Sequence, residues 1–233
     1  MPRGPRLDTP GALQHVMVRG IEACRIFLSD RDREDLLKRF AEVMPASETA
    51  VYAWSLLTNH FHLLIRPKQH SISQLMQSVL VSHTQRYHKH RQSLGHVWQG
   101  RFRSPVIEED DHLLTVLRYI EANPVRAEMV EHAGDYRWSS FTAHGQGAGN
   151  ELLSVCPPYQ QLSPYAAVRQ RRWEAYVHQT PDADELSAIR RSVERSLPFG
   201  SHAWVKKLST KLNLDLTIRP RGRPKTTTTE SGK

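Results

Sequence analysis

The stretch NHFHLLIRP (residues 59–67) alternates two kinds of side chain. Because successive side chains of a β-strand point to opposite faces, His60 and His62 share one face of a predicted strand. The opposite face carries Phe61, Leu63 and Ile65. This apolar face predicts packing against a core, which leaves the two histidines for a different role. Histidines two residues apart also arise by chance, so the spacing alone leaves that role open.

Patterns on both sides of this strand predict strands and helices in alternation. Period-two patterns predict strands over residues 12–20, 49–58, 60–67 and 97–107, the last marked by Pro105 as an edge or bulged strand. Helical spacing after a capping Ser or Asp predicts helices over residues 29–44 and 71–93. The order β-α-β-β-α-β is that of the α+β, ferredoxin-like (split βαβ) fold. Its helices cover one face of an antiparallel sheet, so we expect His60 and His62 on the open face.

Positive charge is concentrated in one part of the chain. The formal net charge is +8, and neither Asp nor Glu occurs from Thr49 to Ile107. A solvated surface usually mixes both signs of charge, whereas a long basic stretch interleaved with aromatic residues favours a polyanion such as nucleic acid. The basic residues of this window that we assign to nucleic-acid contact are Arg66, Arg86, Lys89, Arg91, Arg101 and Arg103.

The cysteines and the two ends of the chain indicate a soluble cytoplasmic protein. Cys24 and Cys156 form no CxxC pair, so neither a disulfide framework nor a structural zinc site is expected. The N-terminus has no apolar leader, and no run approaches the roughly 18 apolar residues of a membrane span. Residues 217–233 are expected to be disordered. Their Arg221-Gly222-Arg223-Pro224 sequence resembles an AT-hook, which binds the minor groove of A·T-rich DNA, although a solubilising basic tail explains it equally well.

A further helix is predicted from residue 108 to Pro124, which is expected to end it. Its four leading acids suit a helix N-terminus, and we prefer this interpretation to metal ligation. The apolar stripe consists of Leu113, Leu117 and Ile120. Tyr119 and Asn123 lie one turn apart at the border of this stripe. A border tyrosine is usually half-buried packing, so its position alone does not indicate catalysis.

Four motifs together resemble those of one family. They are NHFHLLIRP (59–67), GHVWQGRF (95–102), RYIEANPVRA (118–127) and YRWSSF (136–141). In this order they are similar to the motifs of the REP-associated tyrosine transposases, which belong to the HUH single-tyrosine transposases of bacterial insertion sequences. The resemblance covers residues 12–141.

The resemblance implies a mechanism. His60 and His62 match the histidine pair that binds a divalent cation, and Asn123 matches the polar residue that completes the metal site. Tyr119 matches the nucleophile that attacks a phosphodiester of single-stranded DNA and leaves a 5′-phosphotyrosine and a free 3′-OH. A 3′-OH can reverse this step, so one tyrosine suffices for cleavage and rejoining. Two imidazoles with an amide oxygen tolerate Mg²⁺ and suit Mn²⁺ better.

The resemblance also implies partners and a layout. We expect a bacterial, nucleoid-associated monomer or homodimer that binds single-stranded or hairpin DNA, with Arg126 among its DNA contacts. A catalytic domain is expected over residues 1–145, and a helical extension over residues 146–216 that adds DNA contacts, shields the site or simply packs. Relatives vary at Asn123, and many carry His in place of Glu121. An acid at position 121 points away from the nucleophile on a helix, so we expect no catalytic effect from it.

Three other functions compete with this interpretation. An RNA-recognition module has the same topology, but it needs stacking aromatic residues where this strand carries histidines. A zinc hydrolase would also use the two histidines, but the surrounding window offers no carboxylate. The third is a relative that binds DNA but has lost its activity. The presence of His60, His62, Tyr119 and Asn123 argues against such a loss.

Overall fold

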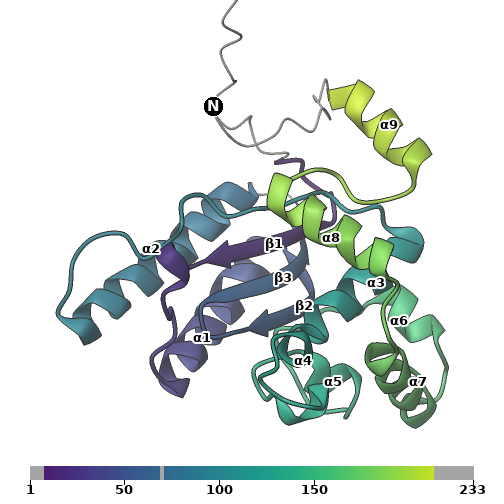
Figure 1. Cartoon of the computed structure of the whole chain (residues 1–233), viewed down its shortest axis with the longest axis horizontal. Helices are drawn as coiled ribbons and strands as arrows, with labels where there is room; N and C mark the ends of the chain where they lie inside the picture. Colours follow the sequence, from purple (N-terminus) through teal and green to yellow (C-terminus); the bar gives the residue numbers. More distant parts are fainter. Residues whose placement is uncertain (1–7, 69–70, 213–233) are drawn as a thin grey trace, which may run out of the picture.

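The computed structural model describes residues 8–68 and 71–212, and an antiparallel sheet lies at its centre (Figure 1). The sheet contains β1 (Gln14–Arg19), β2 (Ala50–Leu56) and β3 (His60–Arg66) in the order β1-β3-β2. This arrangement confirms the predicted α+β class with an antiparallel sheet. Because β3 lies between the other two strands, its alternating side chains enter both layers that flank the sheet.

One face of the sheet is covered by α1 (Asp30–Ala46) and α2 (Ile72–Arg91) (Figure 1). A capping box between Ser29 and Asp32 fixes the start of α1. The core on this side takes Phe61, Leu63 and Ile65 from β3, together with Leu36, Phe40, Met44, Leu75, Met76 and Val79 from the two helices. The prediction for the apolar face of residues 59–67 is therefore confirmed.

The second face of the sheet is covered as well, which corrects the expectation of an open face. Leu64 lies on this face beside His62, and burying an apolar side chain favours a covering helix. That helix is α3 (Asp110–Glu121), which buries Leu113, Val116, Leu117 and Ile120 against the sheet. Two helices of the C-terminal extension, α7 (Ala166–His178) and α8 (Ala183–Arg195), add Trp173, Val177, Ile189 and Val193 to the same core.

The segment predicted as a fourth strand is an irregular edge beside β1. Its bridges join Gln14 to Val106, Met17 to Arg103 and Gly20 to Trp98, and no continuous ladder forms. Gly100 has a φ of 90°, outside the strand region, and Pro105 has no N–H to donate, so the pairing is interrupted. The segment occupies the fourth position of the sheet without forming a regular strand.

The helix that was expected to end at Pro124 instead breaks just before it. α3 ends at Glu121, and a short helix, α4 (Asn123–Arg126), carries Pro124 in its first turn, where a missing N–H is tolerated. The other short elements are η1 (Ile21–Ala23), η2 (Ala133–Asp135), α5 (Phe141–His144) and α6 (Pro157–Gln161). The predicted helices of the extension are found as α7, α8 and α9 (His202–Leu212). Within the described residues, none of the helices has the length and apolarity needed to cross a membrane.

Replacing Gly20 with Ala is expected to destabilise the turn that follows β1. A Cβ at this position would lie 2.5 Å from the carbonyl oxygen of Cys24 and 2.8 Å from the side chain of Ile26. Because a backbone atom cannot move aside cheaply, we expect a loss of about 1–3 kcal/mol in the free energy of unfolding, measured by urea denaturation. Gly149→Ala is the control, since a Cβ there meets no atom within 4 Å. Equal stability of the two variants would contradict the prediction.

Candidate active site

The register of the sheet adds a third histidine to the pair seen in the sequence. Met17 of β1 lies opposite His62 and His15 lies opposite Leu64, so His15 projects from the same face as His60 and His62. The ring centroids of His60 and His62 are 5.1 Å apart, and those of His15 and His62 are 5.0 Å apart. Three imidazoles therefore form a row on the side of the sheet that faces α3.

Each histidine of the predicted pair uses its Nδ1 atom in a hydrogen bond. Nδ1 of His60 lies 2.6 Å from Oδ1 of Asn59, and Nδ1 of His62 lies 2.8 Å from Nε2 of His15. The Nε2 atoms of His60 and His62 have no hydrogen-bond partner among the described residues. Both rings can therefore offer an Nε2 lone pair to a ligand.

Burial keeps these imidazoles neutral at ordinary pH. Burial lowers the pKa of His15 to about 3 and the pKa of His60 to about 4. The pKa of His62 also lies well below its usual value, first because the ring is buried and second because His15, His60 and Arg126 are close. Neutral imidazoles are the form that binds a metal ion.

α3 places Tyr119 against this row. The half-buried ring of Tyr119 meets His15 edge to face at a centroid distance of 5.7 Å and His62 at 6.0 Å. The guanidinium of Arg126 lies 4.2 Å from the centroid of the Tyr119 ring and donates to the Tyr119 carbonyl oxygen. Burial lowers the pKa of Arg126 to about 10, so this group remains a cation at neutral pH. The site therefore holds a fixed positive charge against the ring of Tyr119.

Asn123 begins α4, one turn after Tyr119, and is 8% exposed. Its Nδ2 atom is buried without a hydrogen-bond partner among the described residues. An orphaned buried amide one turn after a tyrosine that packs on His62 suits a missing ligand, because the amide can turn its oxygen toward a cation. The described residues contain no group of three His, Cys, Asp or Glu side chains that could hold a metal. A metal here would therefore rely on the two histidines and the amide.

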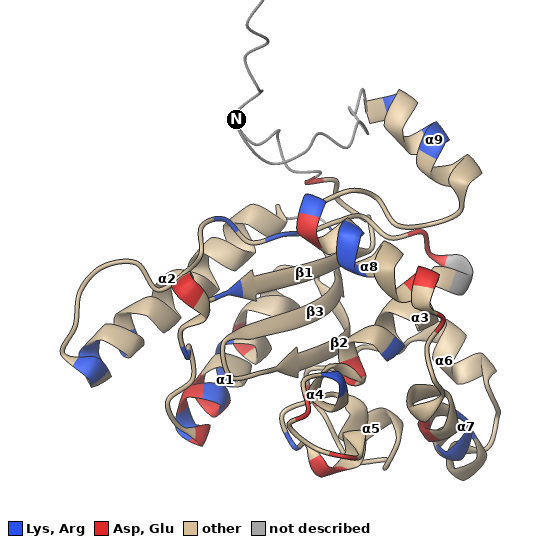
Figure 2. Ribbon diagram, in the orientation of Figure 1, with Lys and Arg blue, Asp and Glu red and all other residues tan. Residues whose placement is uncertain are grey.

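The predicted DNA-contacting residues do not form one surface. Arg86, Lys89 and Arg91 lie on α2, on the other side of the sheet from His62. Arg86 pairs with Asp35 at 2.8 Å and Arg66 pairs with Glu109 at 2.9 Å. Acidic residues from outside residues 49–107 therefore neutralise part of the positive charge of that window. Helix α1 carries side chains of both signs of charge (Figure 2).

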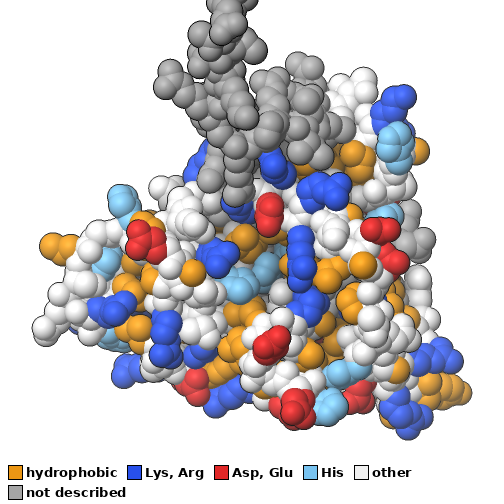
Figure 3. Space-filling view, viewed as in Figure 1, with side chains coloured by type: hydrophobic (Ala, Val, Ile, Leu, Met, Phe, Trp, Pro, Cys, Tyr) orange, Lys and Arg blue, Asp and Glu red, His pale blue; other side chains and the backbone are white. Residues whose placement is uncertain are grey.

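The remaining residues of that set lie closer to the site or outside the structure. Arg101 and Arg103 lie in the irregular segment beside β1, and Arg126 lies against Tyr119. Arg221 and Arg223 lie outside the described residues. Histidine side chains occur near the middle of the face shown in Figure 3, with lysine and arginine side chains around them.

Sequence patterns missed three residues of this site. His15 was inside a predicted strand, and only the pairing of β1 with β3 shows that it touches His62. Arg118 and Arg190 lie close enough to Arg126 for their positive charges to lower its pKa. Arg190 comes from the extension, so no local motif indicates it.

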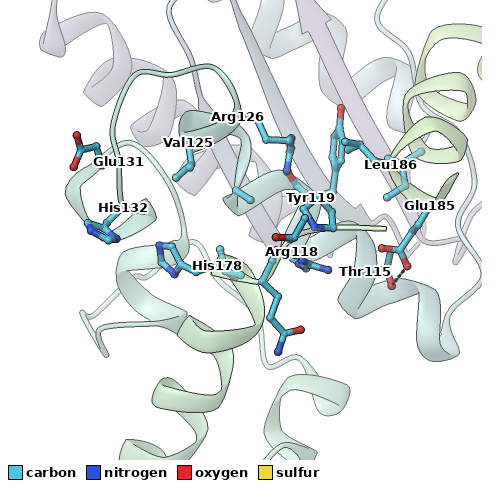
Figure 4. Close-up of a pocket in the computed structure, with 16 residues that line it drawn as sticks. Thr115, Arg118, Tyr119, Val125, Arg126, Glu131, His132, His178, Glu185 and Leu186 are labelled. Carbon is cyan, nitrogen blue, oxygen red and sulfur yellow. Dashed lines mark hydrogen bonds between the residues drawn. The ribbon is translucent and has the colours of Figure 1, made fainter. Parts of the chain in front are cut away.

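A cavity of about 420 Å³ lies next to Tyr119, between α3, α4 and the connection from α7 to α8. Figure 4 shows His132 and His178 on one side of Tyr119 and Arg126, and Thr115 and Glu185 on the other. A hydrogen bond from Thr115 to Glu185 joins α3 to α8 at its edge. The extension therefore forms one wall of the space beside the candidate nucleophile.

Comparison with known proteins finds a matching family model and a similar fold. Residues 12–123 match the family model described as "Transposase IS200 like". A solved structure of a REP-associated tyrosine transposase bound to a REP hairpin matches with a TM-score of 0.52 and 19% identity, over 66% of this chain and 92% of that chain. No curated protein matches the sequence.

A second solved structure, described as a transposase of Deinococcus radiodurans R1, matches with a TM-score of 0.34 and 16% identity, over 52% of this chain and 96% of that chain. The match with the REP-associated transposase supports the fold, and the family model covers both histidines, Tyr119 and Asn123. Residues 12–123 of this chain are therefore similar to the IS200-like transposases.

Proposed function

We propose that the protein cuts and rejoins single-stranded DNA through a covalent bond to Tyr119. The observation that carries this proposal is the contact of the Tyr119 ring with His62 and His15 on one side and with the Arg126 guanidinium on the other. This setting unites a nucleophile, neutral imidazoles and a fixed cation. Those three components are what phosphodiester attack by a tyrosine requires.

In the proposed reaction the Tyr119 hydroxyl loses its proton and its oxygen attacks the phosphorus of a phosphodiester. The bond from phosphorus to the 3′ oxygen breaks, and that oxygen takes up a proton and leaves as a free 3′-OH. The DNA 5′-phosphate stays on the tyrosine as an ester. A 3′-OH that attacks this ester releases Tyr119 and rejoins the strand, so no external energy source is needed.

His60, His62 and Asn123 would hold a divalent cation, Mg²⁺ or Mn²⁺, through two imidazole nitrogens and an amide oxygen. When bound, such an ion polarises the scissile phosphate and stabilises negative charge in the transition state. The protein's own residues do the rest. Arg126 places a positive charge against the Tyr119 ring, and the packing of α3 against the sheet holds the nucleophile beside His62.

The proposed substrate is single-stranded DNA next to a hairpin, of the REP type. The support for this partner is the fold shared with a transposase solved on a REP hairpin, together with the net charge of +8. Of the predicted contacts, Arg126 lies on the Tyr119 ring and Arg103 bridges to Met17, the residue opposite His62. The rival RNA-recognition function is disfavoured because α3 covers the face on which bases would stack.

We further propose residues 1–145 as the catalytic unit and residues 146–216 as an extension that shields it. α7 and α8 share a core with α3, and they form one wall of the cavity beside Tyr119. A shielded site excludes water from the phosphotyrosine ester, which protects it from hydrolysis.

Replacing His62 with Ala tests the metal site. We expect cleavage of a labelled hairpin substrate with Mn²⁺ to fall by at least about 100-fold, because the developing charge loses its stabilisation. Hairpin binding should change little, since basic residues supply the affinity for phosphate. Gel assays of nicking and binding measure both effects.

His202→Ala is the matched control, because His202 is exposed and lies at the start of α9, outside the candidate site. It should leave cleavage unchanged. The metal assignment is wrong if a variant lacking both His60 and His62 still cleaves at the full rate.

A further inference from the structure

One of the proposed metal ligands, His62, is hydrogen-bonded to a second histidine, His15. Nε2 of His15 and Nδ1 of His62 are 2.8 Å apart, and both rings are buried. A neutral imidazole carries one N–H, so one ring donates this bond and the other accepts it. The direction of the bond decides which nitrogen of His62 keeps a free lone pair.

The ligand role of His62 fixes that direction. A metal at Nε2 requires a lone pair there, so the N–H of neutral His62 must be on Nδ1. This N–H points at Nε2 of His15, which must accept it. The opposite direction, with His15 donating, would place the proton of His62 on the atom that is needed for the metal.

His60 makes a similar hydrogen bond through Nδ1, and the direction of this bond cannot reverse because its partner is an amide oxygen. The side-chain amide of Asn59 donates from Nδ2 to the carbonyl oxygen of Ala23 at 3.2 Å, which fixes the amide so that Oδ1 faces His60. An amide oxygen only accepts, so Nδ1 of His60 carries the N–H and Nε2 stays free. Both ligand candidates therefore have a partner on the nitrogen away from the metal, as metal-bound histidines usually do.

We propose that His15 is a positioning residue that accepts the Nδ1–H of His62 and thereby holds His62 in the tautomer and orientation that bind the divalent cation. This inference rests on the proposed metal site and adds a residue to it. The pairing of β1 with β3 holds His15 in place, and its backbone N–H donates to Pro105 at 3.0 Å.

A purely structural role would not favour histidine at this position. Nδ1 of His15 is buried without a hydrogen-bond partner among the described residues. A buried polar atom without a partner is destabilising, and leucine at position 15 would remove it with a similar side-chain volume. We therefore expect His15→Leu to fold with at least the stability of the wild type and still to bind the metal more weakly.

The test compares His15→Leu with His15→Gln in the full-length protein. The Gln side chain can place an amide oxygen near the position of Nε2, so it keeps an acceptor for His62 while removing the imidazole. Mn²⁺ binding is measured by electron paramagnetic resonance, and thermal melting confirms folding. We expect His15→Leu to weaken Mn²⁺ binding by about 10–100-fold and His15→Gln to recover most of that loss.

A second measurement follows the tautomer directly. Nitrogen NMR of the protein with Mg²⁺ should show the proton of His62 on Nδ1 in the wild type and in His15→Gln. In metal-free His15→Leu the proton should move in part to Nε2. Detection of the His62 proton on Nε2 in the Mg²⁺-bound wild type would overturn the proposal.

The outcomes separate this proposal from the metal site on which it rests. If His60→Ala weakens Mn²⁺ binding but His15→Leu does not, His15 has no positioning role and the metal site stands. If His15→Gln binds as weakly as His15→Leu, the acceptor explanation is overturned. If neither His60→Ala nor His62→Ala changes Mn²⁺ binding, the metal site itself is wrong and the role of His15 falls with it.

Discussion

Replacing Tyr119 with Phe is expected to abolish nicking and the covalent protein–DNA adduct together. The change removes one oxygen from a half-buried ring, so the packing of α3 on the sheet is retained. Cleavage needs that oxygen as the attacking atom, and loss of a catalytic nucleophile lowers the rate by about 10⁶-fold. Hairpin affinity should stay near that of the wild type. Incubation with labelled single-stranded hairpin DNA and Mn²⁺, followed by denaturing electrophoresis, measures nicking and adduct at once.

Tyr165→Phe is the matched control for this experiment. It removes the same oxygen from a tyrosine that is 73% exposed on the extension, and it should leave both products unchanged. Nicking by Tyr119→Phe at a rate near that of the wild type would mean that water, and not Tyr119, attacks the phosphate.

Replacing Glu121 with Ala is expected to cause the largest loss of stability. This carboxylate is fully buried and accepts three hydrogen bonds, from Ser140 Oγ at 2.5 Å, His144 Nδ1 at 2.6 Å and Trp173 Nε1 at 2.7 Å. Removing it leaves three buried donors without their acceptor. Loss of one partner from a buried charged network costs about 3–5 kcal/mol, to be measured by urea denaturation.

Glu174→Ala on α7 is the control, because Glu174 is exposed and its removal should change stability by less than about 0.5 kcal/mol. A loss below about 1 kcal/mol for Glu121→Ala would show that the three donors find other partners. The network joins the nucleophile helix to α5 and α7, so we expect Glu121 to act on activity only through the stability of α3.

The main features of the fold could be predicted because they depend on local spacing. The alternation of residues 59–67 correctly separated Phe61 and its neighbours from His60 and His62, since the period of a strand is fixed by its backbone. The helices α1, α2 and α3 follow from apolar spacing and caps. The fourth strand was predicted from a loose alternation that Gly100 and Pro105 interrupt in the structure.

Long-range contacts explain what the sequence could not show. The contact of His15 with His62 joins residues 47 positions apart, and that of Trp173 with Glu121 joins residues 52 positions apart, so neither follows from spacing along the chain. The second face is covered by α3, and α7 and α8 of the extension add to the same core through contacts that are distant along the chain. The prediction of one basic surface from residues 49–107 failed for the same reason. Asp35 and Glu109, which lie outside this window, pair with Arg86 and Arg66.

The central claim is that Tyr119 forms the bond to DNA, and peptide mapping of the wild-type adduct tests it most directly. Trypsin cuts after Lys and Arg, so Tyr119 falls in the peptide YIEANPVR (residues 119–126), in which it is the one tyrosine. After reaction on single-stranded hairpin DNA with Mn²⁺ and digestion of the DNA, we expect this peptide to carry a nucleotide joined through its 5′-phosphate to the Tyr119 oxygen. A nucleotide on any other residue, or nicking without an adduct, would contradict the account.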